Sequence, residues 1–151
     1  MTIYPSKATG LVYRALRGSL WIHKGDLAKP TTSAYVRRKP SPEKAGDPSG
    51  ISFSDTPRTA VMNVNPHGVM EICCESVCSL RNEFDNISLE TEWDDASHGN
   101  IKNVPYYDEE GDEDQLKEAN RLAAELVNVS TVVLNKADAL KLKATFLEQG
   151  N

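Results

Sequence analysis

The sequence lacks the long apolar segments that would place it in a membrane. Its longest uninterrupted apolar stretches are a few residues, as at 132–134, whereas a membrane-spanning helix needs about 20 apolar residues. Residues 1–10 contain no apolar core of a secretory signal. We therefore expect a soluble protein that stays in the cytoplasm.

Cysteine is also scarce, because the chain has only Cys73, Cys74 and Cys78, all within six residues. Cysteines this close together cannot pair without strain, so no disulfide framework is predicted. His67 or His98 could complete a zinc site with them, but unpaired buried cysteine in a strand is the commoner arrangement. The pattern therefore predicts free thiols and no metal.

The common catalytic signatures are missing as well. The chain has no Gly-x-Ser-x-Gly elbow, no His-Glu-x-x-His helix and no dinucleotide glycine fingerprint. Asn135-Lys136-Ala137-Asp138 has the letters of the guanine-reading tetrad, yet no phosphate-binding loop accompanies it. We interpret these four residues as the start of a helix, with Asn135 as its cap.

Length and charge describe one polar domain, over residues 1–151. Apolar residues make up 39% of the chain and charged residues 26%, which is within the range of globular proteins. Residues 1–60 carry ten Lys and Arg against four Asp and Glu, whereas residues 61–151 carry seven against eighteen. This asymmetry indicates either two partner surfaces or basic and acidic segments that pack together.

The first two thirds of the chain predict short strands separated by irregular stretches. Strands are expected at 10–16, 31–36 and 51–54, and a strand followed by a helical turn at 69–80. Asp55, Thr56 and Pro57 predict a helix start. Residues 39–50, rich in proline, glycine and serine, predict a loop, and residues 83–114, with twelve acidic residues, predict a mobile region containing one short strand.

The last forty residues predict a helix, a strand and a second helix. An acidic first turn at 112–114 precedes apolar residues at helical spacing up to Asn128. Residues 129–134 are rich in β-branched side chains and predict a buried strand. Leu140, Ala144 and Leu147 predict the apolar face of the last helix. The fold class is therefore α+β, with a mainly antiparallel or mixed sheet and two C-terminal helices flanking a late strand.

One candidate ligand site combines Arg14 on the first strand with Ser52 and Ser54 on another. Arginine offers a rigid fork to phosphate, and hydroxyls two residues apart on a strand point the same way. This pattern resembles that of the ADP-ribosyltransferases, in which an early-strand arginine and a Ser-x-Ser strand help to bind NAD. The resemblance implies a downstream catalytic glutamate; Glu90 and Glu92 have the letters but lie in the acidic region.

His98 is the candidate catalytic residue, because an imidazole exchanges protons near pH 7 and Gly99 would let a backbone approach a ligand. The pattern from His98 through Ile101 to Pro105, followed by a Leu-Ala helix, resembles small uncharacterised bacterial proteins. That resemblance implies a single domain and no particular activity. A structural or merely exposed histidine is the alternative.

Two function classes remain open. In the first, the acidic and basic surfaces dock a protein partner, as in an immunity or accessory protein. In the second, the domain binds a nucleotide or another phosphate-bearing small molecule, with NAD as a remote cofactor candidate. The basic run at 37–39 could contact nucleic acid, but an overall pI of about 5.2 argues against such a partner.

Overall fold

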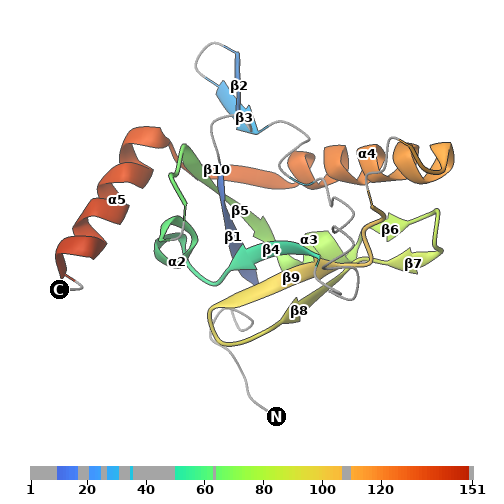
Figure 1. Cartoon of the computed structure of the whole chain (residues 1–151), viewed down its shortest axis with the longest axis horizontal. Helices are drawn as coiled ribbons and strands as arrows, with labels where there is room; N and C mark the ends of the chain where they lie inside the picture. Colours follow the sequence, from blue (N-terminus) through green and yellow to red (C-terminus); the bar gives the residue numbers. More distant parts are fainter. Residues whose placement is uncertain are drawn as a thin grey trace.

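An antiparallel sheet of six strands forms the centre of the structure (Figure 1). In spatial order the strands are β10 (Ser130–Leu134), β5 (Gly68–Cys73), β1 (Leu11–Leu16), β4 (Ile51–Ser54), β9 (His98–Lys102) and β8 (Glu90–Trp93). The computed structural model describes residues 10–16, 21–24, 27–30, 35, 50–62, 64–106 and 110–149.

Two hairpins and four helices complete the described part of the chain. The hairpins pair β2 (Trp21–Lys24) with β3 (Leu27–Pro30) and β6 (Arg81–Asn82) with β7 (Ile87–Ser88). The helices are α2 (Pro57–Val61), α3 (Cys74–Cys78), α4 (Glu113–Asn128) and α5 (Lys136–Gln149). The predicted single α+β domain, with two C-terminal helices flanking a late strand, is confirmed. Among these helices, none has the length and apolar character needed to cross a membrane.

The main core lies between α4 and one face of the sheet. Leu122, Ala123 and Leu126 of α4 are fully buried in one cluster with side chains from β1, β4, β5 and β9. Phe53 and Trp93 meet edge to face in this core, with ring centroids 5.0 Å apart. Burial of these apolar groups is the main force that holds α4 to the sheet.

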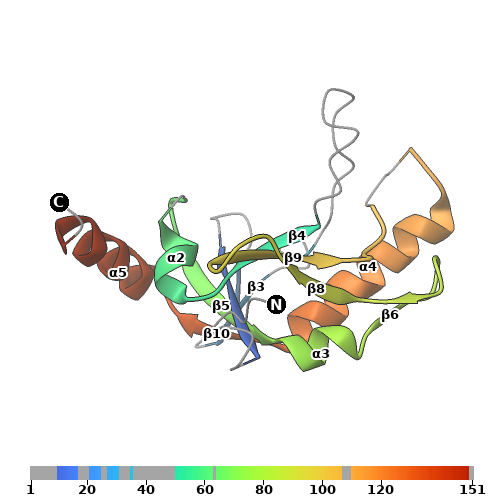
Figure 2. The same cartoon turned by 90° about the horizontal axis from the view of Figure 1, so that it is seen from below.

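The other face of the sheet is covered at one end by α2 and α5, which lie side by side in both views (Figures 1 and 2). Helix α4, on the first face, lies at the opposite end of the molecule. Val61 of α2, Val69 of β5 and Ala139 of α5 are buried together there. Neighbouring residues of a strand point to opposite faces of the sheet. Met70 therefore faces the main core, and Val69 faces this second cluster of buried residues.

Three of the described helices begin at a side chain that caps the backbone. Thr56 accepts a hydrogen bond from the backbone N–H of Thr59 at 3.1 Å, and Pro57 occupies the first position of α2. Asp112 caps α4 through two backbone N–H groups. Asn135 Oδ1 accepts from the N–H of Asp138 at 2.8 Å at the start of α5. Local hydrogen bonds thus define where these helices begin.

The expectation of one short strand in residues 83–114 is wrong. The region contains β7, β8 and β9, and the last two belong to the central sheet. Leu89 is fully buried, whereas Glu90 and Glu92 are exposed. The acidic side chains therefore remain in solvent while the backbone of β8 pairs with β9, so the charge does not prevent strand formation.

Two expectations for the C-terminal segment need correction. The strand at 130–134 is not buried, because β10 lies at the edge of the sheet and Val133 remains 39% exposed. The predicted apolar face of α5 is exposed at Leu140 and Leu147. The helix instead turns Ala139 and Leu142 toward α2 and β5, because that stripe also recurs at helical spacing.

Some predicted elements lie outside the described residues. The loop at 39–50 does so except for Gly50, where an added Cβ would lie 1.9 Å from the carbonyl oxygen of Ile101. This close approach explains the glycine directly before β4. The strand predicted at 31–36 also lies outside the described part except for Tyr35, which is buried.

Candidate functional site

A row of polar side chains crosses the sheet. Five of its members come from the neighbouring strands β10, β5, β1, β4 and β9, one from each strand. The pairing register places these residues opposite one another, so their side chains share a face of the sheet. The last member follows directly after β8, where its backbone N–H bonds the carbonyl oxygen of His98 at 2.9 Å. In spatial order the row is Thr131, Glu71, Tyr13, Ser54, His98 and Asp94.

His98 is held by a carboxylate from the turn that joins β8 to β9. Its Nδ1 lies 2.7 Å from Asp94 Oδ2, and the side-chain amide of Asn100 donates to the same oxygen at 3.0 Å. Asn100 is buried, whereas the His98 and Asp94 side chains are 42% and 47% exposed. The buried amide therefore orients a carboxylate that in turn orients a solvent-accessible imidazole.

This contact determines which nitrogen of His98 is available for chemistry. Because a carboxylate accepts hydrogen bonds, Nδ1 carries the hydrogen when the imidazole is neutral. The lone pair then lies on Nε2, on the far side of the ring from Asp94. Carboxylate–imidazole pairs in this arrangement prepare a histidine to accept a proton from a neighbouring group.

The turn that carries Asp94 is itself fixed by Asp95. Asp95 Oδ1 accepts hydrogen bonds from the backbone N–H of Ser97 at 2.8 Å and of His98 at 2.9 Å. The Ser97 backbone contact, followed by that of the Ser97 hydroxyl, lowers the pKa of the Asp95 carboxyl. These bonds fix the backbone of the turn up to His98.

Arg14 and Ser52, two of the candidate ligand-binding residues, contact each other. Arg14 Nη1 donates to the carbonyl oxygen of Ser52 at 2.7 Å and to its Oγ at 3.2 Å. Because β1 and β4 pair at one position, Tyr13 with Ser54, these bonds tie the two strands together beyond that pair. Arg14 thus has a structural role beside Ser52, in addition to the ligand-binding role that we predicted for it.

The four predicted site residues are therefore neighbours within β1, β4 and β9. Ser54 stands opposite His98, and Ser52, bonded to Arg14, is two residues away on β4, a spacing of roughly 7 Å. Ser52 also stands opposite Asn100, which stands opposite Glu92 of β8. Their roles in binding and catalysis remain predictions.

Sequence reasoning missed Asp94, Asn100 and Tyr13. The residues before His98, Asp-Asp-Ala-Ser at 94–97, include turn formers. They were a signal for a tight hairpin that would bring Asp94 close to His98. Tyr13 is hydrogen-bonded to Glu71, and its pKa is raised first by burial and then by this contact. No local pattern reveals that bond, because the two residues meet only through strand pairing.

Comparison with known protein families, with curated proteins and with solved structures finds no match. The function of the chain must therefore be inferred from its own residues. Cys73, Cys74 and Cys78 are free thiols. Among the residues that the structure describes, no three or more His, Cys, Asp and Glu side chains form a group that could hold a metal ion.

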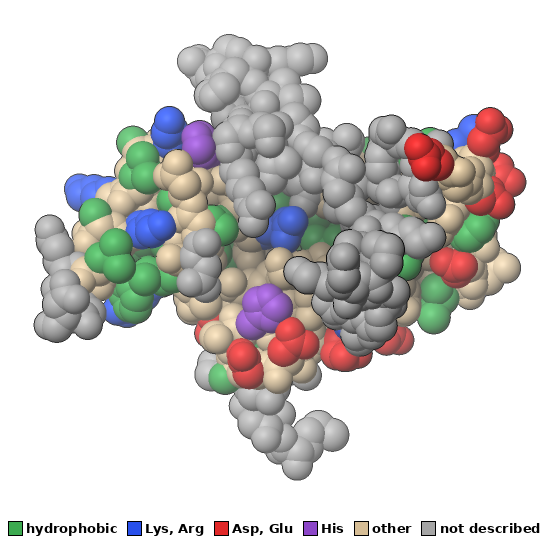
Figure 3. Space-filling view, viewed as in Figure 1, with side chains coloured by type: hydrophobic (Ala, Val, Ile, Leu, Met, Phe, Trp, Pro, Cys, Tyr) green, Lys and Arg blue, Asp and Glu red, His purple; other side chains and the backbone are tan. Residues whose placement is uncertain are grey.

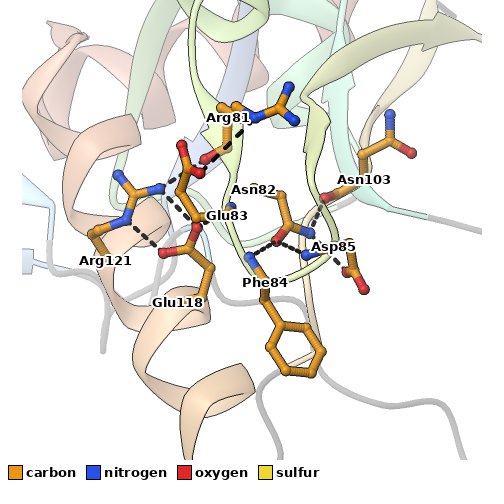
Figure 4. A network of polar contacts seen from close by, with 8 residues as sticks. All are labelled: Arg81, Asn82, Glu83, Phe84, Asp85, Asn103, Glu118 and Arg121. Carbon is orange, nitrogen blue, oxygen red and sulfur yellow. Dashed lines mark hydrogen bonds and ion pairs between the residues drawn. The ribbon is translucent and has the colours of Figure 1, made fainter.

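A second polar cluster joins α4 to the β6–β7 hairpin (Figure 4). Glu118, which is only 8% exposed, accepts hydrogen bonds from Arg121 Nε at 2.5 Å and Nη2 at 2.8 Å and from the backbone N–H of Glu83. The Arg121 hydrogen bond is the main cause that lowers the pKa of Glu118. Arg121 also donates to the carbonyl oxygen of Arg81 at 2.7 Å, so the pair fixes the hairpin to the helix.

Charge is separated along the molecule (Figure 3). Acidic side chains gather at the end formed by the start of α4 and the β6–β7 hairpin, whereas Lys and Arg gather at the end formed by α2 and α5. The basic end includes Lys136 and Lys141 of the last helix, so the folded surface does not follow the division of the sequence at residue 60. Ion pairs within the second half, Arg81 with Glu83 and Arg121 with Glu118, lie at the acidic end.

Proposed function

We propose that the face of the sheet around β4 and β9 binds a phosphate-bearing small molecule of the nucleotide class and that His98 is its acid–base group. The observation that carries this proposal is the contact of His98 with Asp94, whose carboxylate is oriented by the buried amide of Asn100. Such preparation of an imidazole is typical of sites that move protons.

The neighbouring groups suit an anionic ligand. Arg14 supplies a positive charge beside the hydroxyl of Ser52, and Ser54 adds a second hydroxyl on the same strand. Guanidinium and hydroxyl groups are common donors to phosphate oxygens. A phosphate near Ser52 would place the rest of the ligand close to His98, which lies on the neighbouring strand β9.

The resemblance to ADP-ribosyltransferases makes NAD the first nucleotide to test. The arginine and the Ser-x-Ser strand of that pattern are adjacent here, through the hydrogen bonds of Arg14 to Ser52. Glu92, which we expected in a weakly structured stretch, lies on β8 in line with Asn100 and Ser52. These placements support a dinucleotide as ligand.

Thermal unfolding with NAD, ATP, a sugar phosphate and inorganic phosphate tests the proposal. A ligand at 100 times its Kd should stabilise the protein by about 2.7 kcal/mol, which corresponds to a Tm increase of several degrees. The increase should be lost in Arg14→Ala and retained in Lys141→Ala, which removes an exposed positive charge on α5. Absence of any ligand-dependent increase in the wild-type protein would contradict the proposal.

A second candidate function, docking of a basic protein partner, is favoured by the acidic end of the molecule. Phe84 and Ile87 are 38% and 41% exposed in the β6–β7 hairpin. A shallow hollow beside them is lined by Glu83, Phe84, Asp114, Lys117, Glu118 and Arg121. Apolar anchors surrounded by charge are typical of protein interfaces, so an immunity or accessory role in the cytoplasm fits this surface.

The docking proposal predicts a partner whose binding weakens with salt. Neutralising Glu113 and Asp114 with glutamine and asparagine should reduce its affinity, because the partner would lose charge complementarity. Asp138→Asn, exposed on α5 at the opposite end of the molecule, is the matched control. A partner that binds equally well at high salt and to the neutralised variant would rule out electrostatic docking at this end.

A further inference from the structure

We propose that Ser54 is a nucleophile activated by His98 and Asp94, which gives the domain the chemistry to cleave activated phosphoryl or acyl esters. This inference rests on the same site as the proposed function but requires a covalent step that ligand binding alone does not. The hydroxyl, the imidazole and the carboxylate lie in that order across β4, β9 and the turn after β8.

The pairing register brings the three groups together. Ser54 and His98 are directly opposite each other in an antiparallel pair, so their Cβ atoms are about 5 Å apart on one face. Asp94 continues the line, with its backbone bonded to His98 and its carboxylate 2.7 Å from Nδ1. Because Asp94 occupies Nδ1, the nitrogen that remains for Ser54 is Nε2.

Two further observations support a working site. The buried Asn100 holds the Asp94 oxygen that contacts His98, so the carboxylate is supported from behind. Ser54 and His98 are both partly exposed, which leaves them accessible to a ligand.

The reaction divides into two balanced steps. In the first, Ser54 Oγ forms a bond to the phosphorus or carbonyl carbon, its proton moves to His98 Nε2, and the bond to the leaving group breaks as that group takes the proton. In the second, a water molecule gives a proton to His98 and attacks the Ser54 ester. The ester bond breaks, and the proton returns to Ser54 Oγ.

Labelling with a fluorophosphonate probe tests the nucleophile. Attack of Ser54 would expel fluoride and leave one phosphonyl group, visible as a single mass increase and located on the Ser54 peptide by mass spectrometry. Ser54→Ala should abolish the adduct, and Asp94→Asn should slow labelling at least tenfold, because the imidazole loses its oriented tautomer. Ser88→Ala, on the exposed strand β7, is the matched control and should label like the wild-type protein.

Nitrogen NMR of the folded wild-type and Asp94→Asn proteins gives a second readout. The wild-type imidazole should carry its proton on Nδ1 when neutral, and the variant should lose that preference. An adduct on Ser54 without stabilisation by any nucleotide would support the nucleophile and overturn the nucleotide proposal. Nucleotide stabilisation without an adduct, or an adduct elsewhere in the chain, would overturn the nucleophile and leave the ligand proposal standing.

Discussion

Replacing Asn82 with alanine is expected to destabilise the protein through one buried amide in the β6–β7 hairpin (Figure 4). Asn82 is fully buried. Its Nδ2 donates to the carbonyl oxygen of Asn103 at 2.7 Å and to Asp85 Oδ2 at 2.9 Å. Its Oδ1 accepts from the backbone N–H groups of Phe84 and Asp85, each at 3.0 Å. One side chain thus closes the hairpin and fixes it to the segment after β9.

The magnitude follows from these four hydrogen bonds. Each contributes a net stabilisation of about 0.5–1.5 kcal/mol, so the four together contribute about 2–6 kcal/mol. Phe84 and Asp85 are exposed, so water can replace part of what their groups lose. We therefore expect Asn82→Ala to lower the free energy of unfolding by about 3 kcal/mol, which corresponds to a Tm decrease of about 6–12 °C.

Denaturant unfolding followed by circular dichroism measures this change. Asn120→Ala is the matched control, because Asn120 is exposed on α4 and alanine favours helix there by up to about 0.7 kcal/mol. The two variants should differ in unfolding midpoint with similar slopes. If Asn82→Ala changes the free energy of unfolding by no more than the control does, the hydrogen-bond reasoning is refuted.

Three further predictions concern stability. Gly99→Ala should cost about 1–3 kcal/mol in chemical denaturation, because its Cβ would lie 2.6 Å from the ring of Phe53 and 2.7 Å from a backbone oxygen; an unchanged midpoint would contradict this clash. The lowered pKa of Glu118 means that its ionised form stabilises the fold above the ordinary pKa of 4.5, and that this contribution is lost as the pH falls through and below that value. Unfolding midpoints should therefore fall less steeply toward pH 3 in Glu118→Gln than in the wild-type protein. Asp112→Ala should cost about 1 kcal/mol by calorimetry, since two backbone N–H groups of α4 lose their cap.

The boundaries of several elements could be predicted because they depend on contacts between residues close in sequence. Thr56, Asp112 and Asn135 each cap a helix through a backbone N–H two or three residues further on. The strand at 51–54 also follows its alternation, with Ile51 and Phe53 buried and Ser52 exposed. Such patterns are local, so no knowledge of the rest of the fold is needed to read them.

The orientation of α5 could not be predicted in this way. Leu140 and Leu147 recur at helical spacing, and so do Ala139, Leu142 and Phe146. Either stripe could form the buried face of an isolated helix. Packing against α2 and β5 selects the second stripe, where Arg58 lies 3.8 Å from the ring centroid of Phe146. Tertiary contacts therefore decide between two faces of similar apolar character.

By itself, the sequence determined that this chain forms an α+β domain and where most of its described helices begin. It also singled out Arg14, Ser52, Ser54 and His98 as candidate site residues. Only the tertiary structure decided that Ser54 faces His98, because 44 positions separate them and strand order alone joins β4 to β9. The same pairing made Asp94 and Asn100 part of the candidate site. Strand register is a nonlocal property, set by which apolar faces bury together, and a one-residue slip would turn every one of these side chains to the opposite face.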